Sequence, residues 1–215
     1  MIKLSASILA CNNAFLGDEV KKLEKAGADI LHIDVMDGHY VENFTFGPDT
    51  VRDLKKLTDL PMEVHFETYH PERMIDMFHR VGVERIGVQH DCCDMPIRTL
   101  EYIRSLGMKA GMGIRPSDGV EDLKYLFGHL DFIIVMSVEP GFGGQPFETS
   151  CVEKVKTLKR LMKEADVQID VAVDGGINKD NIGMVKDAGV DYLIVGNSLY
   201  AYGDLEQTVR EYRGE

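Results

Sequence analysis

Residues 30–40 read ILHIDVMDGHY, an apolar run that is interrupted by polar side chains at every second position. Because successive side chains of a strand point to opposite faces, His32 and Asp34 lie on one face and Ile33 and Val35 on the other. The apolar face suits a covering layer of helices, and the polar face suits the inside of a closed sheet. The stretch predicts a strand that carries ionisable groups at its carboxyl end.

Seven more apolar, β-branched runs occur along the chain, and segments with helical periodicity separate them. In the first such segment, Leu16, Val20 and Leu23 share one helix face. Gly27 and Gly189 stand where a helix ends before the next strand. The eight predicted strands cover residues 3–8, 30–35, 62–66, 86–89, 109–114, 132–136, 169–173 and 192–195.

Eight strands that alternate with helices predict parallel β-α-β units, and eight units is the number in a TIM barrel. A doubly wound open sheet is the structural alternative. No GxGxxG follows the first strand, as many open sheets that bind dinucleotides would have. The polar strand ends belong to the second, third and seventh strands. In an open sheet the site lies at one point where the strand order reverses, and residues from these three strands would not meet there. With no low-complexity linker, the sequence predicts an α/β protein: a single-domain (β/α)8 TIM barrel over residues 1–215.

Composition narrows the classes of partner. The net charge of −12, without a basic stripe, argues against nucleic acid. No apolar run is long enough to cross a bilayer, and the N-terminal segment predicts a first strand rather than a signal peptide. The cysteines form no CxxC pair and are expected to be reduced thiols. We therefore expect a cytoplasmic protein that does not bind membranes. The four cysteines are Cys11, Cys92, Cys93 and Cys151.

Four ionisable residues end predicted strands: His32, Asp34, His65 and Asp174. In a barrel, the carboxyl ends of all strands meet at one mouth. Each residue alone has a simpler interpretation, as a helix cap or an ion-pair partner of Lys or Arg. Four such groups inside one barrel need a common partner, and one divalent metal ion satisfies all of them. The residue types suit Zn, Fe, Mn or Co and do not choose among these metals.

Glycine-rich turns follow the last three predicted strands, at 141–144, 175–176 and 196–197. TIM barrels commonly bind phosphate at the turns after the seventh and eighth strands. Met36 and Met136 fall at inward strand-end positions and are expected to form walls of the same site. A metal beside a phosphate site predicts chemistry on a small phosphorylated molecule.

Five segments in order resemble the ribulose-phosphate 3-epimerase family, and the resemblance covers nearly the whole chain. The family implies a (β/α)8 barrel of the ribulose-phosphate-binding type, a catalytic divalent metal, homo-oligomeric assembly and epimerisation at C3 of a ketose phosphate. The segments are SASILACN (5–12), HIDVMDGHYVENFTFGP (32–48), EVHFE (63–67), MSVEPGFGGQPF (136–147) and VDGGI (173–177).

Carried over by position, the resemblance implies that His32, Asp34, His65 and Asp174 bind the metal and that Asp34 and Asp174 are the catalytic acid/base pair. It also implies residues that contact the substrate, with glycines at the phosphate and methionines over the reacting carbons. These are Ser7, Met36, His65, Met136, Gly143, Gly144, Gly175, Gly176, Gly196 and Asn197.

The implied reaction interconverts D-ribulose 5-phosphate and D-xylulose 5-phosphate through an enediolate. The C3 proton becomes removable when a metal stabilises the charge of this enediolate. One carboxylate takes the proton from one face, and the other returns a proton to the opposite face. Asp34 and Asp174, on the second and seventh strands, approach a ligand from different sides.

This sequence also departs from the family pattern. Glu67 stands where the family usually has Met, on the same strand face as His65. We expect Glu67 to bind a substrate hydroxyl; the alternative is that it turns outward to a Lys or Arg. The altered pocket leaves a second substrate hypothesis, a 3-epimerase of another ketose phosphate such as allulose 6-phosphate or a tetrulose phosphate. The other departures are Ala6 for Pro, Gln89 for His, Arg115 for Asn or Lys, and Ala172 for Glu.

Two further functions fit the sequence less well. A lyase-class barrel enzyme, such as hexulose-phosphate synthase, has different strand motifs, and no strand-end Lys is evident here. A phosphosugar sensor without catalytic activity would need the glycines but not all four metal-binding side chains.

Overall fold

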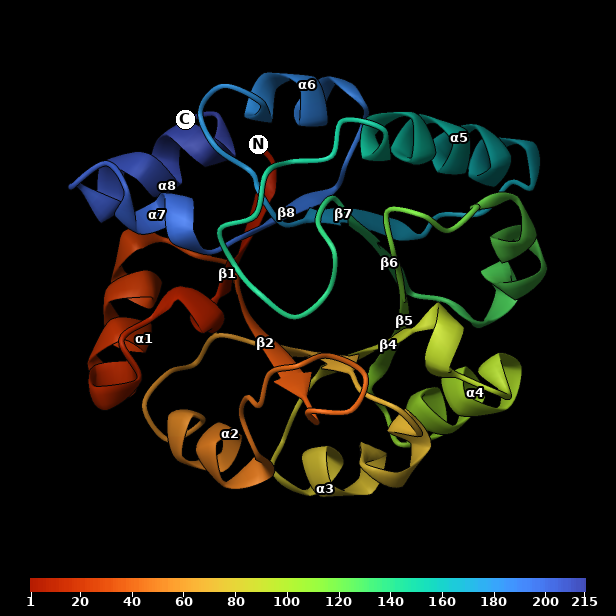
Figure 1. Cartoon of the computed structure of the whole chain (residues 1–215), viewed down its shortest axis with the longest axis horizontal. Coiled ribbons are helices and arrows are strands. Elements are labelled where there is room, and N and C mark those ends of the chain that lie inside the picture. The colour runs from red at the N-terminus through yellow and green to blue at the C-terminus, as the bar shows by residue number, and fades with distance from the viewer.

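Eight parallel strands close into a barrel in the computed structural model, which describes residues 1–215 (Figure 1). The strands follow one another around the ring in chain order, and β1 pairs with both β2 and β8. This closure confirms the TIM barrel and excludes the open sheet. The strands are β1 Lys3–Ser7, β2 Ile30–Met36, β3 Met62–Glu67, β4 Arg85–Gln89, β5 Lys109–Ile114, β6 Phe132–Met136, β7 Asp170–Asp174 and β8 Tyr192–Val195.

Each observed strand agrees with its predicted range to within one residue at either end. The largest shift is in β7, which begins and ends one residue later than predicted and so includes Asp174. Most strand boundaries are accurate because glycine or polar residues border the apolar runs.

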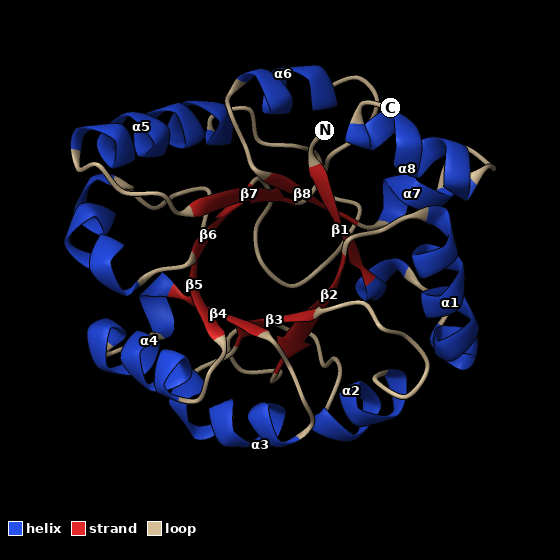
Figure 2. Cartoon of the chain, turned by 180° about the vertical axis from the view of Figure 1, so that it is seen from behind, coloured by secondary structure: helices blue, strands red, loops and turns tan.

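Helices form an outer ring around the barrel (Figure 2). The helix after β5 is a 3-10 helix, and the other connections use α-helices. The α-helices are α1 Leu16–Ala26, α2 Pro48–Leu54, α3 Ile75–Arg80, α4 Pro96–Ser105, α5 Cys151–Glu164, α6 Ile182–Asp187, α7 Asn197–Tyr200 and α8 Leu205–Arg213; the 3-10 helices are η1 Ile8–Ala10, η2 Asn13–Phe15, η3 Pro71–Arg73, η4 His90–Cys92 and η5 Glu121–His129.

The predicted helix ends are confirmed at Gly27 and Gly189. Both adopt left-handed backbone angles, with φ of 94° and 93°, and their N–H groups donate to helix carbonyls. Side chains other than glycine rarely adopt these angles, so glycine lets the chain turn from the helix into the next strand. On α1, Val20 and Leu23 are fully buried, as the helical periodicity predicts.

Strand alternation divides the side chains into two sets. Outward-facing residues such as Ile33 and Val35 join the main hydrophobic core between the barrel and the helices. A smaller apolar cluster, including Phe132 and Tyr192, fills part of the barrel interior. On β5 the inward positions are glycines, and a Cβ at Gly111 would lie 2.2 Å from the Phe132 ring. Glycine therefore makes room for a large neighbouring side chain inside the narrow barrel.

Two long loops lie at the carboxyl ends of the strands. Residues 137–150, between β6 and α5, extend across the mouth of the barrel (Figure 1). Asn43, in the loop after β2, donates from Nδ2 to the Gly141 carbonyl at 2.8 Å. Val41 packs closely against Gly141: a Cβ added at Gly141 would lie 3.0 Å from the Cβ of Val41. These contacts connect the two loops above the barrel interior.

The four cysteines are free and buried, which confirms that they are unpaired thiols. No helix has the length and apolar character that a membrane span requires.

Candidate active site

A cavity of about 310 Å³ opens at the carboxyl ends of the strands, beneath the loop after β6. It brings together most residues that the sequence indicated as site residues. His32 and His65 do not line it, because both are fully buried. The predicted residues that line the cavity are Ser7, Asp34, Met36, Glu67, Met136, Gly143, Gly144, Asp174, Gly175, Gly176, Gly196 and Asn197.

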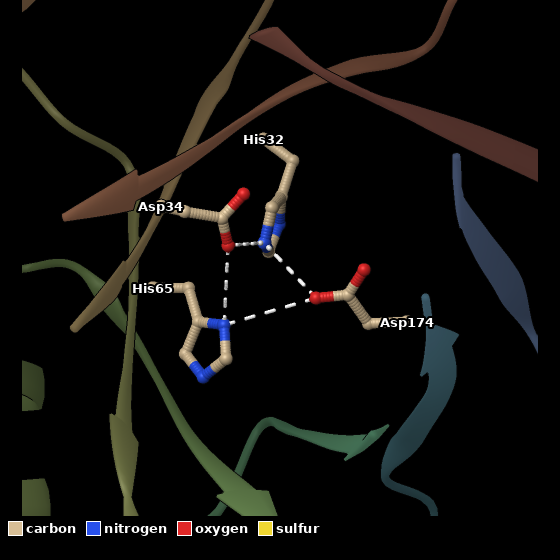
Figure 3. A group of neighbouring side chains, drawn as sticks. All are labelled: His32, Asp34, His65 and Asp174. Atoms are coloured by element: carbon tan, nitrogen blue, oxygen red, sulfur yellow. Dashed lines mark hydrogen bonds and ion pairs between the residues drawn. The ribbon is translucent and has the colours of Figure 1, made fainter. Parts of the chain in front are cut away.

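The two histidines and two aspartates form one cluster, which we call the His/Asp cluster: His32, Asp34, His65 and Asp174 (Figure 3). His32 Nε2 lies 3.0 Å from Asp34 Oδ1 and 3.6 Å from Asp174 Oδ2. His65 Nδ1 lies 3.5 Å from Asp34 Oδ1 and 3.9 Å from Asp174 Oδ2. The closed barrel thus brings β2, β3 and β7 to one point.

The donor atoms of this cluster fit a divalent metal ion. Ligand atoms bound to one ion at 2.0–2.2 Å lie about 3–4 Å apart, which is the range found here. Both ring nitrogens of His65 are buried without a hydrogen-bond partner. A buried imidazole without a partner is unfavourable, and a metal ion would use one of its nitrogens.

Glu63, which lies further from the mouth of the barrel than the His/Asp cluster, orients His32. Its Oε1 lies 3.0 Å from His32 Nδ1, so Nε2 is directed toward the His/Asp cluster. Arg85 Nε and the Tyr192 hydroxyl both donate to Glu63 Oε2, at 2.6 and 2.8 Å. A carboxylate that holds the second nitrogen of a histidine is typical of metal sites. Alternation along β3 placed Glu63 inside the barrel, but Arg85 and Tyr192 had no signal in the sequence that linked them to the site.

The surroundings of the two aspartates separate their pKa values in the metal-free protein. Burial opposes the charge of Asp34, but His32 and His65 outweigh it and hold the pKa of Asp34 far below its ordinary value. Burial raises the pKa of Asp174 to about 7, since His32 offsets it only in part. Burial lowers the pKa of His32, yet Asp34, Glu63 and Asp174 together raise that pKa well above its ordinary value. The cluster thus contains an Asp34–His32 ion pair beside a carboxyl group whose charge is disfavoured.

The glycine turns form the wall of the cavity on the side of β7 and β8. Gly175 and Gly176 adopt positive φ angles of 102° and 59°. A Cβ at Gly176 would lie 2.9 Å from the backbone of Phe147, and a Cβ at Gly144 would lie 2.9 Å from Asn197 Nδ2. Glycines from three turns line the cavity and carry no side chain that would cover their backbone, as a phosphate site requires.

Four further side chains lie in or beside the wall of the cavity: Ser7, Met36, Gln89 and Met136. The Ser7 hydroxyl donates to Asp34 Oδ2 at 3.0 Å. Gln89 Nε2 contacts Met136 Sδ at 2.8 Å. Met36 and Met136 are almost fully buried and line the cavity, as their inward strand positions predicted.

Glu67 points into the cavity and not toward a surface cation. Its side chain is buried, and it forms no ion pair. The alternative of an outward Glu67 paired with Lys or Arg is therefore wrong, because inward alternation continues to the last residue of β3. Arg115 lies outside the cavity, where it pairs with Asp91 at 2.9 Å and Asp118 at 2.8 Å.

The remaining departures lie within the barrel wall. Ala6 is buried in the main core, and Ala172 lies in the interior apolar cluster. Several cavity residues had no signal of their own in the sequence, because they come from the flanks of the turns or from distant loops. They include Leu9, Ala10, Val138, Ile177, Asn178, Ser198 and Tyr202.

The fold and site together define a class of protein: a (β/α)8 barrel with a metal-compatible His/Asp cluster and glycine turns at the same mouth. The model of the ribulose-phosphate 3-epimerase family matches residues 3–200. The chain belongs to this family, which is a family of isomerases.

Curated relatives match along the whole chain. Ribulose-phosphate 3-epimerase from Bacillus subtilis (strain 168) is 40% identical over 215 residues, which are 100% of this chain and 99% of that protein. The chloroplastic ribulose-5-phosphate-3-epimerase of Arabidopsis thaliana is 37% identical, over 97% of this chain and 75% of that protein.

Solved structures with low sequence identity support the barrel fold. A mutant tryptophan synthase α-subunit from Pyrococcus furiosus has a TM-score of 0.69 and 16% identity, over the full length of both chains. A 3-hexulose-6-phosphate synthase has a TM-score of 0.64 and 15% identity, over 99% of each chain. These similarities concern the fold alone. Membership of the epimerase family argues against the lyase-class alternative.

Proposed function

We propose that this protein is a metal-dependent 3-epimerase that interconverts D-ribulose 5-phosphate and D-xylulose 5-phosphate. The observation that carries the proposal is the His/Asp cluster at a cavity that also has glycine turns on its β7–β8 side. The relative from Bacillus subtilis, whose name states this activity, supports the choice of substrate.

His32, Asp34, His65 and Asp174 would hold one divalent ion, and the residue types are compatible with Zn, Fe, Mn or Co. When bound, such an ion supplies a positive charge that stabilises the negative charge developing on the sugar oxygens as the C3 proton leaves. Glu63, held by Arg85 and Tyr192, fixes the orientation of His32.

Asp34 and Asp174 are the proposed acid/base pair. They belong to β2 and β7, which β1 and β8 separate in the ring, so their carboxyl groups reach the cavity from different directions. One carboxylate takes the C3 proton from one face of the sugar, and the other carboxyl group gives a proton to the opposite face. The configuration at C3 is thereby inverted, while the sugar neither gains nor loses atoms. Ser7 orients Asp34 through its hydrogen bond.

The cavity wall at Gly143, Gly144, Gly175, Gly176, Gly196 and Asn197 is the proposed phosphate site. Met36 and Met136 line the cavity near the reacting carbons and limit the access of water to the enediolate. His65, predicted from the sequence to contact the substrate, is fully buried and does not line the cavity, so it is proposed to act as a metal-binding residue.

Solvent-deuterium exchange tests this function. The metal-loaded protein is incubated in D2O with D-ribulose 5-phosphate, and the products are analysed by NMR. We expect D-xylulose 5-phosphate with deuterium at C3. A protein that binds the metal but neither exchanges the C3 proton nor forms the epimer would contradict the proposal and favour a phosphosugar sensor or another substrate.

The inward Glu67 supports a second candidate, a 3-epimerase of another ketose phosphate such as allulose 6-phosphate or a tetrulose phosphate. The same exchange assay with these sugars separates the two candidates by their values of kcat/KM.

Homo-oligomeric assembly and a cytoplasmic location stay predictions from the sequence. Light scattering of the purified protein tests the first.

A further inference from the structure

We infer that Glu67 is a substrate-binding residue whose carboxyl group hydrogen-bonds the C1 hydroxyl, a group that all the candidate ketose phosphates carry. The inference rests on the proposed function, since it assumes a phosphorylated ketose in the cavity. It concerns one end of that ligand and assigns Glu67 no part in proton transfer.

The Glu67 side chain is buried at the cavity with one carboxyl oxygen unpaired. Glu67 is 2% exposed, it lines the cavity, and its Oε2 atom is buried without a hydrogen-bond partner. Buried polar atoms of proteins are nearly always hydrogen-bonded. Because no group of the chain pairs with Oε2, a ligand hydroxyl is a suitable partner for this atom.

The neighbours of Glu67 exclude simpler roles. It lies outside the group of four side chains whose donor atoms could share a metal ion. Met36, which is paired with Glu67 across β2 and β3, and Met136, which lines the same cavity, offer only weakly polar sulfur atoms to a ligand. Asp34, the other carboxylate on this side of the cavity, already binds Ser7 and His32. Glu67 is therefore the strongest hydrogen-bonding group that remains available on this wall.

The order of groups across the cavity indicates which hydroxyl Glu67 meets. The glycine turns follow β6, β7 and β8, whereas β3 lies on the opposite side of the ring from β7 and β8 (Figure 2). The His/Asp cluster lies between them. A ketose phosphate with its phosphate at the glycines and C2–C3 at the cluster extends its C1 hydroxyl toward β3.

A comparison of two substrates across variants tests the inference. Rates of C3 deuterium exchange are measured for D-ribulose 5-phosphate and for its 1-deoxy analogue, which lacks only the C1 hydroxyl. We expect the wild-type protein to prefer the natural sugar by about 10- to 100-fold in kcat/KM, as the loss of a buried hydrogen bond implies. Glu67→Met should reduce this preference to less than about threefold, and Glu67→Gln should retain part of it because the amide still forms hydrogen bonds.

Glu72→Met is the matched control, because it removes an exposed carboxylate five residues further along the chain. It should retain the wild-type preference. Melting profiles show whether each variant folds, and Glu67→Ala replaces Glu67→Met if the latter does not. An unchanged preference in a folded variant without the carboxyl group would overturn the inference. So would a large loss of metal affinity in Glu67→Gln, since this would make Glu67 a metal ligand.

The experiment distinguishes this inference from the proposed function. A wild-type protein that exchanges no C3 proton contradicts the epimerase proposal. Calorimetric binding of the two sugars to the wild-type and Glu67→Met proteins then tests Glu67 independently of turnover. Equal discrimination between the two sugars by both proteins would overturn the role of Glu67.

Discussion

At the scale of the residue, the two aspartates of the His/Asp cluster have different surroundings. Asp34 accepts hydrogen bonds from Ser7 and has His32 beside it, whereas Asp174 lies 3.6 Å from His32 and has no side-chain hydrogen bond. Pairs of carboxyl groups in unequal environments are common where one group takes a proton and the other gives one. The geometry is therefore suited to the proposed two-carboxylate reaction.

Asp34→Asn and Asp174→Asn test that reaction. Each change removes a proposed proton-transfer group while nearly preserving its shape, so we expect kcat to fall by about 1,000-fold in either variant. Steady-state kinetics measure the loss, and the melting profile should show that the fold is kept. Full activity in either variant would refute the two-aspartate mechanism.

Gly113 determines the space available to His65. A Cβ at this position would lie 2.6 Å from His65 Nε2. We expect Gly113→Ala to displace the imidazole, to destabilise the protein by about 1–3 kcal/mol and to weaken metal binding. Denaturant unfolding and metal titration measure the two effects. Gly128→Ala is the control, since a Cβ there meets no atom within 4 Å; equal effects in both variants would contradict this explanation.

At the scale of the element, β3 carries three different tasks on one face. Glu63 supports His32, His65 belongs to the His/Asp cluster, and Glu67 lines the cavity. The period of two along a strand places these residues on successive levels from the interior to the mouth. Neighbouring β4 supplies Arg85 at the deepest of these levels, beside Glu63.

Removal of Arg85 tests the importance of this deep level. Arg85→Met leaves the fully buried Glu63 carboxylate without its cation, so we expect a loss of about 3–5 kcal/mol in the free energy of unfolding. Metal affinity should also fall, because Glu63 no longer holds His32 firmly. Lys156→Met, which breaks an exposed pair with Glu153, should change stability by less than about 0.5 kcal/mol. Similar losses in the two variants would show that the buried pair has no special role.

At the scale of the whole molecule, barrel closure is what creates the site. The cluster joins β2 and β3 to β7, and only the pairing of β1 with β8 makes these strands neighbours across the interior. The contacts between the loops after β2 and β6 then cover the mouth. A metal ion bound at this junction would stabilise the closed barrel as a unit.

Removal of the metal tests this link. A ligand present at 100 times its Kd stabilises the native state by about 2.7 kcal/mol, so chelation should lower the Tm by about 5–10 °C. Thermal melts with a chelator, and with added Zn²⁺, Mn²⁺, Co²⁺ or Fe²⁺, measure the effect. A variant with both Asp34→Asn and Asp174→Asn should not respond. A wild-type Tm that no metal changes would contradict metal binding at the cluster.

Much of this protein is determined locally in its sequence. Apolar, β-branched runs predicted the eight strands. Alternation along those strands placed His32, Asp34, His65 and Glu67 on inward faces, because the side-chain period of a strand holds in every fold. Contacts between distant segments were not determined locally. The support of Glu63 by Arg85 and Tyr192, the unpartnered state of Glu67 and the distances within the His/Asp cluster depend on the closed ring, since 129 positions along the chain separate Glu63 from Tyr192. Sequence patterns describe one strand at a time, and only the tertiary structure decides which side chains of different strands meet.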